Sequence, residues 1–203
     1  MKYFSNLPLI NYPQADGSTI ILTNIVTRTY LTNQLAKQPL LFYEYTLNEG
    51  DLPEIVADKY YGASEQYWLI PLSNQNKIMD LQWDWPLSPL NLNLYITSKY
   101  GSVSNAVSEI HHYEKKIINT NVATGESSES IVIIDQYEYA NTSIGTTIYT
   151  LPNGNQVEQV IDKTFVNSYE YEELVNEEKR TIGLINKDYT YDIENQFKVL
   201  YTS

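Results

Sequence analysis

The spacing of apolar and polar positions is most regular between residues 41 and 81. Residues 41–47 are rich in aromatic and β-favouring types, which predicts a strand. A polar turn then leads into a helix, for which Asp51 is the expected N-cap and Pro53 lies near the first position. The apolar residues within 55–60 share one helical face, and Gly62 is expected to end the helix.

A second helix is predicted directly after the first. Ser64 can cap it, and the apolar side chains around Trp68 predict that it is buried. Pro71 predicts a kink or an early end, and Asn74 closes the unit. Residues 78–81 predict a short second strand, which we expect to pair antiparallel with the first. The pattern therefore predicts a strand–helix–helix–strand core.

Two less regular regions flank this core. Residues 1–38 predict an N-terminal arm of strand or coil that is interrupted by proline and Asp-Gly turn signals. After the core, an aromatic loop at residues 83–87 precedes a helix that begins at Pro89 and ends at Gly101. We therefore expect the central domain to cover residues 39–102.

The remainder of the chain predicts a β-rich part followed by a helical part. Residues 103–165 predict an insertion of two β-hairpins, with turns at residues 123–128 and 152–155. Residues 166–203 predict a helical C-terminal segment whose last helix starts at Asp188. The expected fold class is therefore α+β.

Composition and charge narrow the range of functions. Hydrophobic residues make up 42% of the 203 positions and charged residues 19%, as in a globular protein rather than a disordered chain. The formal net charge is −12, which disfavours binding to nucleic acid and to anionic membrane surfaces. Cysteine is absent, so disulfides, zinc–thiolate sites and thiol catalysis are excluded.

The sequence contains neither a secretory h-region at its start nor an apolar run that approaches the roughly 18 residues of a membrane helix. We therefore expect the protein to be made in the cytoplasm.

Candidate catalytic residues are few. His111 and His112 are adjacent, so we expect their rings to point apart and to form a poor metal site. Glycine-rich phosphate loops and a nucleophile elbow are absent from the sequence. Acidic pairs such as Glu172-Glu173 are typical of solvated helix faces. The sequence therefore predicts no enzyme activity, no cofactor and no metal.

Residues 45–62 resemble the opening of a LysM domain. That family runs from a strand through a Gly-Asp turn to a helix that ends in Tyr-Gly, followed by a second helix that ends near Asn. Gly50-Asp51, Tyr61-Gly62 and Asn74 stand at those positions. The resemblance implies a LysM-like fold, and it keeps open an alternative function as a peptidoglycan-binding module of a phage lysin or tail protein.

A closer resemblance is to the baseplate wedge protein 53 family of contractile-tailed phages (myoviruses). It is carried by the Tyr-Gly and Tyr-Trp segment at 60–70, the aromatic loop at 83–86, and the segments 99–102, 110–114 and 169–180, with the final helix through Phe197. These pieces occur in the order found in the family, over residues 40–203.

This second resemblance implies a structural protein of the virion. Such a subunit joins neighbouring wedges around the tail hub in a six-fold baseplate, and its partners are other wedge and hub proteins and a sheath-initiator-like subunit. Two departures from sugar-binding LysM domains argue against glycan binding. Leu52 replaces the Thr or Ser that is common after Gly-Asp, and the loop 83–86 is expected to crowd the ligand side.

Exposed aromatic and aliphatic residues are the candidates for the partner interface. The last helix carries an apolar stripe and two additional tyrosines, and helices of this kind dock into grooves on partner proteins. The alternative is that the stripe packs on the core of its own chain. The candidate interface residues are Tyr189, Ile193, Phe197, Leu200, Tyr201, Trp83 and Trp85.

Overall fold

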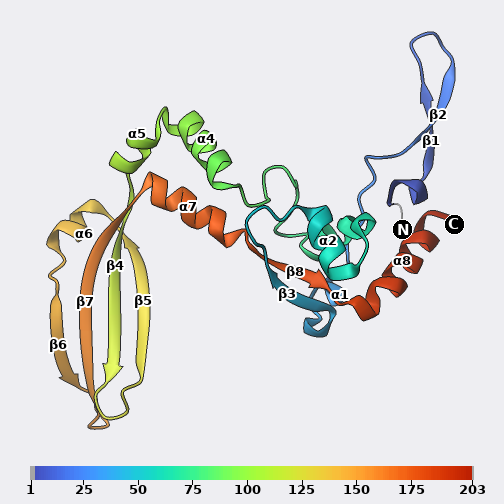
Figure 1. Ribbon diagram of the computed structural model, residues 1–203. Helices are drawn as coiled ribbons and strands as arrows, with labels where there is room; N and C mark the ends of the chain where they lie inside the picture. Colours follow the sequence, from blue (N-terminus) through green and yellow to red (C-terminus); the bar gives the residue numbers. More distant parts are fainter. Residues whose placement is uncertain (1–2, 203) are drawn as a thin grey trace. The chain divides into compact units, whose positions relative to one another are not determined.

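The computed structural model describes residues 3–202 and has a mixed α+β fold. About 40% of the chain is helix and 29% strand, and the strands form several small antiparallel sheets (Figure 1). The expected α+β class is confirmed. The chain divides into two compact units. The first comprises the residues up to Ser88 together with those from Glu177 onward, and the second comprises Pro89–Asn176.

The centre of the first unit consists of a two-stranded sheet and two helical segments. Strand β3 (Phe42–Thr46) pairs antiparallel with β8 (Thr181–Ile185). Between them in the chain come helix α2 (Pro53–Tyr61), the 3-10 helix η3 (Ser64–Trp68) and helix α3 (Leu69–Ser73). Ile182 and Leu184 alternate inward from β8 and are buried, because one face of this small sheet lies against the core.

The predicted strand at residues 78–81 is wrong. The chain turns there, because the Asp84 carboxylate accepts hydrogen bonds from the backbone N–H groups of Met79 and Asp80, at 2.8 Å each. Those two donors are therefore not available to a sheet. Ile78 is buried in the core nonetheless, so the apolar pattern reflects burial without strand formation.

Helix α2 begins and ends for reasons visible in the sequence. Pro53 occupies its first turn, and Gly62 ends it at a φ of 80°, a left-handed conformation that favours glycine. The expected N-cap is wrong, since Leu52 holds that position without a side-chain bond. The carboxylate of Asp51 is held instead by donors from the neighbouring turn and from α2.

The second helical segment is shorter and less regular than predicted. Ala63, not Ser64, is the N-cap of η3, and its side chain makes no capping bond. Pro71 is the third residue of α3, where the missing N–H has no intrahelical acceptor to lose. The early end is confirmed, because α3 stops at Ser73 with Asn74 as its C-cap.

The N-terminal part of the first unit consists of short helices and one hairpin joined by irregular segments. It contains the 3-10 helix η1 (Tyr3–Asn6) and an antiparallel hairpin of β1 (Leu9–Pro13) and β2 (Thr19–Thr23). Helix α1 (Asn33–Ala36) and the 3-10 helix η2 (Pro39–Leu41) follow. Among the described residues, β1 and β2 pair only with each other, so this hairpin is a two-stranded ribbon (Figure 1).

Helix α8 (Lys187–Thr202) completes the first unit. Its Phe197 ring lies 5.1 Å from the rings of both Tyr3 and Trp68, between ring centroids. The first and last helical segments thus meet on η3. This cluster includes Leu69 and Ile185 and forms the second part of the core.

The second unit is built on a four-stranded antiparallel sheet with the strand order β5-β4-β7-β6. The two predicted hairpins are confirmed: one joins β4 (Ile110–Asn121) to β5 (Ser127–Ile134), and the other joins β6 (Gly145–Thr150) to β7 (Gln156–Asn167). Its helices are α4 (Pro89–Tyr100), α5 (Val103–Ser108), α6 (Gln136–Asn141) and α7 (Ser168–Glu178), the last of which continues two residues into the first unit.

Within residues 3–202, none of the helices combines the length and the apolar composition that crossing a bilayer requires.

Candidate functional site

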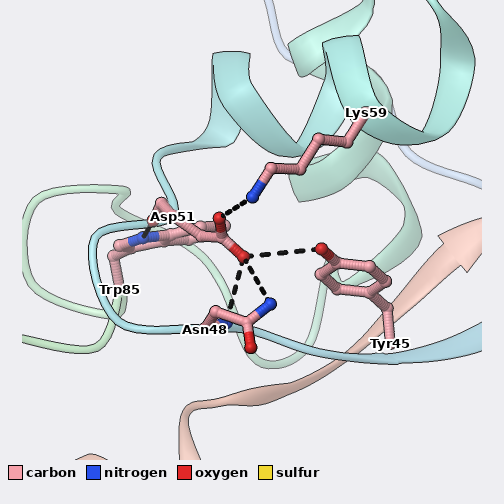
Figure 2. Close-up of polar contacts among 5 residues, drawn as sticks. All are labelled: Tyr45, Asn48, Asp51, Lys59 and Trp85. Atoms are coloured by element: carbon pink, nitrogen blue, oxygen red, sulfur yellow. Dashed lines mark hydrogen bonds and ion pairs between the residues drawn. The ribbon is translucent and has the colours of Figure 1, made fainter.

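The Gly50-Asp51 turn is held by a cluster of hydrogen bonds around one buried carboxylate (Figure 2). Asp51 Oδ2 accepts from the backbone N–H of Asn48 at 3.0 Å and from the Tyr45 hydroxyl at 3.4 Å. Asp51 Oδ1 accepts from Lys59 Nζ at 2.6 Å, and the ammonium comes from α2. The cluster therefore ties the end of β3 to the following turn and helix.

Burial and charge act on this carboxyl in opposite directions. Burial alone would raise the pKa of Asp51, but the Lys59 ammonium and the hydrogen bonds from Asn48 outweigh it and hold the pKa below its usual value. The same contact raises the pKa of Lys59. Desolvation raises the pKa of Tyr45, with the neighbouring Asp51 charge adding to it. The carboxylate is thus a fixed anion whose partners belong to the fold.

Trp85 closes this turn from the other side. Its indole Nε1 donates to the backbone oxygen of Asp51 at 2.8 Å, and its ring is buried in the core (Figure 2). Trp85 is therefore not available to a partner, contrary to its place among the expected interface residues. Trp83 in the same loop is 63% exposed and remains available.

Asn74 connects the end of α3 to the second strand. Its side chain accepts from the backbone N–H of Gly183 at 2.8 Å and donates to the oxygen of the same residue at 2.7 Å. These bonds satisfy both polar backbone groups of Gly183 on β8. Asn74 thus fixes the sheet against the helical segment, which explains why an asparagine stands at this helix end.

The apolar stripe of α8 divides between the core and the surface. Phe197 is buried, and Ile193 and Tyr201 are partly buried against the same cluster. Leu200 is 64% exposed and Tyr189 is 41% exposed. The inner half of the stripe packs on its own chain, which was the alternative considered for it, and the outer half stays open to a partner.

Helix α8 forms one wall of an apolar groove of about 590 Å³, here called the α8 groove. The residues that line it carry no formal charge and come from α8, from α3 and η3, and from the segment 29–35. They include Leu31, Leu35, Trp68, Leu72, Phe197 and Leu200. The sequence pattern predicted the α8 wall but not the opposite wall, because residues 29–32 belong to no helix or strand.

The β1–β2 hairpin exposes a second apolar surface. Directly paired residues share a face of a ribbon, so the pairs Ile10–Leu22 and Tyr12–Ile20 form one wholly apolar face. Each of these four side chains is at least 38% exposed. We expected strand or coil in this arm and did not predict an interaction surface. The signal was present in the sequence, since Asp16 is the only charged residue between positions 7 and 27.

In the second unit, Glu172 does not lie on the solvated face that the sequence predicted. It is buried, and its Oε1 accepts from Lys99 Nζ at 2.6 Å and from the Tyr100 hydroxyl at 2.8 Å. The bond to Glu172 raises the pKa of Lys99 well above its usual value. This ion pair links α7 to the end of α4, so the Glu172 carboxylate is engaged in contacts that hold the fold.

The two histidines do not point apart as expected. The strand register shifts between Ile110 and His112, which marks a β-bulge at His111. The bulge brings the two Nδ1 atoms to 2.8 Å, and His112 Nε2 lies 3.1 Å from Glu114. His111 also stacks on Tyr171 at 3.7 Å between ring centroids.

No group of three or more His, Asp or Glu side chains among residues 3–202 is placed to hold a metal ion.

Comparison with models of known protein families gives no match to this chain, and comparison with curated proteins gives none. Its function is therefore inferred from its own residues.

Proposed function

We propose that this chain is a structural subunit of the baseplate wedge of a contractile phage tail, where it joins neighbouring wedge and hub proteins. The observation that carries the proposal is the exposed apolar face of the β1–β2 hairpin. An isolated two-stranded hairpin is marginal in water, and apolar surface of this kind is typical of sites that another protein covers. Because the apolar face of the β1–β2 hairpin needs a partner to cover it, the chain is suited to a role in a larger protein assembly.

The core supports the same proposal through its LysM-like element order. Strand β3, helix α2 and the η3–α3 segment follow in the expected order, with the Gly50-Asp51 turn and Asn74 at the positions the resemblance requires, whereas the strand that pairs with β3 is β8 and not the predicted residues 78–81. Strand β8 follows α3 only after the second unit has been inserted in the chain. An inserted unit gives a small core additional surface for contacts with neighbours.

A non-enzymatic role is consistent with how the buried carboxylates are engaged. Asp51 and Glu172 are the two buried carboxylates among the described residues, and both are engaged in hydrogen bonds that hold the fold. We therefore assign this protein a scaffolding task, with no cofactor and no metal, in the tail baseplate of the virion.

Co-expression with tail proteins from the same genome tests this proposal. We expect the chain to co-purify in a defined complex with wedge, hub or sheath-initiator-like subunits. Failure to bind any of them, with the chain folded by circular dichroism, contradicts the proposal. Leu22→Asp, which charges the apolar hairpin face, should weaken the complex, whereas Asn11→Asp on the opposite face adds the same charge and should not.

The alternative function is a peptidoglycan-binding module, which the LysM-like core favours. We expect weak or no binding, because Trp85 closes the Gly50-Asp51 turn and Leu52 stands where that family commonly has a hydroxyl side chain. A pull-down on isolated sacculi distinguishes the two functions. Saturable retention that chitin oligomers compete away would favour the peptidoglycan-binding module.

A further inference from the structure

We propose that one face of the four-stranded sheet in the second unit binds an amphipathic helix of a partner protein, with lysine or arginine on both sides of that helix's apolar stripe (Figure 1). The surface consists of residues from β4, β5, β6 and β7, and it shares none with the β1–β2 hairpin or the α8 groove. The proposal therefore goes beyond the baseplate role and does not depend on it.

The sheet has almost no buried side chain of its own. None of residues 117–133 or 143–165 is buried, and the two buried aliphatic residues of the strands, Ile134 and Val166, lie toward the same end. Both hydrophobic clusters of the core belong to the first unit. An antiparallel sheet commonly packs one face on a core, because apolar side chains are stabilised when they leave water. This sheet therefore has apolar surface that a further layer would cover.

Helix α6 lies over one of the two faces. Its Tyr139 ring is 4.5 Å from that of Tyr113, between centroids, and Lys163 donates to the backbone oxygens of Tyr139 and Thr142 at 2.6 and 2.8 Å. Tyr113 and Lys163 share this face, because Tyr113 pairs with Phe165, two positions from Lys163 on β7. The proposed binding surface is the opposite face.

The opposite face carries an apolar band, here called the diagonal band. The strand register sets Ile118 of β4 beside Val160 of β7, with the apolar positions of β5 displaced toward one end of the sheet and that of β6 toward the other. The band consists of Ile133 and Ile131 on β5, Ile118 on β4, Val160 on β7 and Ile148 on β6. Ile131, Ile133 and Ile148 are 56%, 70% and 60% exposed, so the band is open to solvent.

Carboxylates flank the diagonal band on both sides. Glu129 and Glu158 lie on one side of it, and Glu114 and Asp162 lie on the other. Lys116 is the one lysine that the described strands place on this face, and it is paired with Glu129 at 2.7 Å. Glu158 and Asp162 form no ion pair within the part of the chain that the structure describes. The face therefore attracts cations.

A helix with basic flanks matches both the width and the charge of this face. Four strands span about 14 Å, and a helix with its side chains is about 10–12 Å wide, so one helix covers the face. Its apolar stripe would lie on the diagonal band, and its cations would meet the carboxylates beside the band.

Charge also selects a foreign partner over other occupants. A second copy would set the same carboxylates against each other, and nucleic acid is itself an anion. The second unit has no spare lysine for this purpose, because Lys99 is bound to Glu172 and Lys115 to Glu138. The cations that complement the face therefore come from a different protein.

Fluorescence anisotropy with two labelled helical peptides tests the proposal on the purified full chain. Both peptides are stapled, are about 18 residues long and carry the same leucine stripe, which lysines flank in one and glutamates in the other. We expect the lysine peptide to bind, and to bind more weakly as salt is raised. The glutamate peptide should not bind, because its charges repel those of the face.

Two pairs of variants locate the contact. Asp162→Lys should weaken binding of the lysine peptide by at least about tenfold, whereas Glu173→Lys makes the same change of charge at an exposed position of α7 and should not. Ile131→Thr should weaken binding by about fivefold, whereas Val132→Thr alters the neighbouring exposed residue on the other face and should not. Circular dichroism verifies that all four variants remain folded.

Several results would overturn the proposal. They are a lysine peptide that does not bind, equal binding of both peptides, and a control variant that weakens binding as much as its matched partner. Sedimentation velocity adds one more. Self-association of the chain that Ile131→Thr abolishes would mean that a second copy covers the diagonal band, and the partner helix would then be wrong.

Discussion

At the residue scale, a few polar side chains fix the geometry of the first unit by satisfying backbone groups that would otherwise lack partners. Asn74 satisfies both backbone groups of Gly183, and Asp84 satisfies two turn N–H groups. Asp51 does the same for the turn after β3, and its carboxylate is also paired with the Lys59 ammonium. Its contribution should therefore depend on pH.

We expect Asp51→Asn to lower the free energy of unfolding by roughly 1–3 kcal/mol at pH 7, because it weakens hydrogen bonds to a charged group. The folded pKa lies below the usual 3.8, so the carboxylate stabilises the fold above that value. This contribution is lost as the pH falls through the lower folded pKa. Urea titrations between acidic and neutral pH measure it. Asp58→Asn, an exposed change on α2, is the control and should have little effect.

At the element scale, α8 and the β1–β2 hairpin differ in how they are held. Helix α8 packs Phe197 against Tyr3 and Trp68 and completes the second part of the core. The hairpin has both faces exposed along nearly its whole length. Local stability follows the number of buried apolar contacts, so these two elements should open at very different free energies.

Replacing Phe197 with Ala should destabilise the chain by about 3–5 kcal/mol, since it removes a ring from a packed cluster. Leu200→Ala on the exposed side of the same helix should change stability by less than about 0.5 kcal/mol. Thermal unfolding followed by circular dichroism compares the two. Equal losses would mean that α8 is not anchored through Phe197.

Truncation after Lys187 should unfold the chain, because it removes Phe197 from the packed cluster.

The hairpin should exchange its amide hydrogens much faster than β3 and β8 when the chain is dilute. Its hydrogen bonds lie in a two-stranded ribbon without a covering layer, whereas β8 packs against a core. Hydrogen–deuterium exchange read by mass spectrometry compares peptides from residues 7–25 and 181–186. Similar protection of both in the dilute chain would contradict the claim that the hairpin needs a partner.

At the scale of the whole molecule, the sequence predicted what local chemistry determines. The stop at Gly62, the early end of α3 and the two hairpins of the second unit all depend on turn and cap residues within a few positions. The pairing of β3 with β8 was missed because the partner lies more than a hundred residues along the chain, beyond the inserted unit.

The candidate site, like the fold, was predictable only where residues close together in the sequence determine the structure. Helical spacing identified Phe197 and Leu200 as one stripe, yet spacing alone does not tell which of them faces the core. The sequence predicted that Trp85 is an exposed aromatic residue of a loop, whereas in the structure its indole N–H donates a hydrogen bond to the Asp51 carbonyl. The hairpin face required the register of β1 against β2, which no local pattern gives.

The central proposal is that this chain is built into a contractile tail, and quantitative mass spectrometry of tails purified from a phage whose genome carries its gene tests this most directly. The proposed role predicts that intact tails contain peptides of the chain, at a copy number that is a multiple of six. Detection in infected cells, together with absence from purified tails whose other wedge proteins are present, would contradict it.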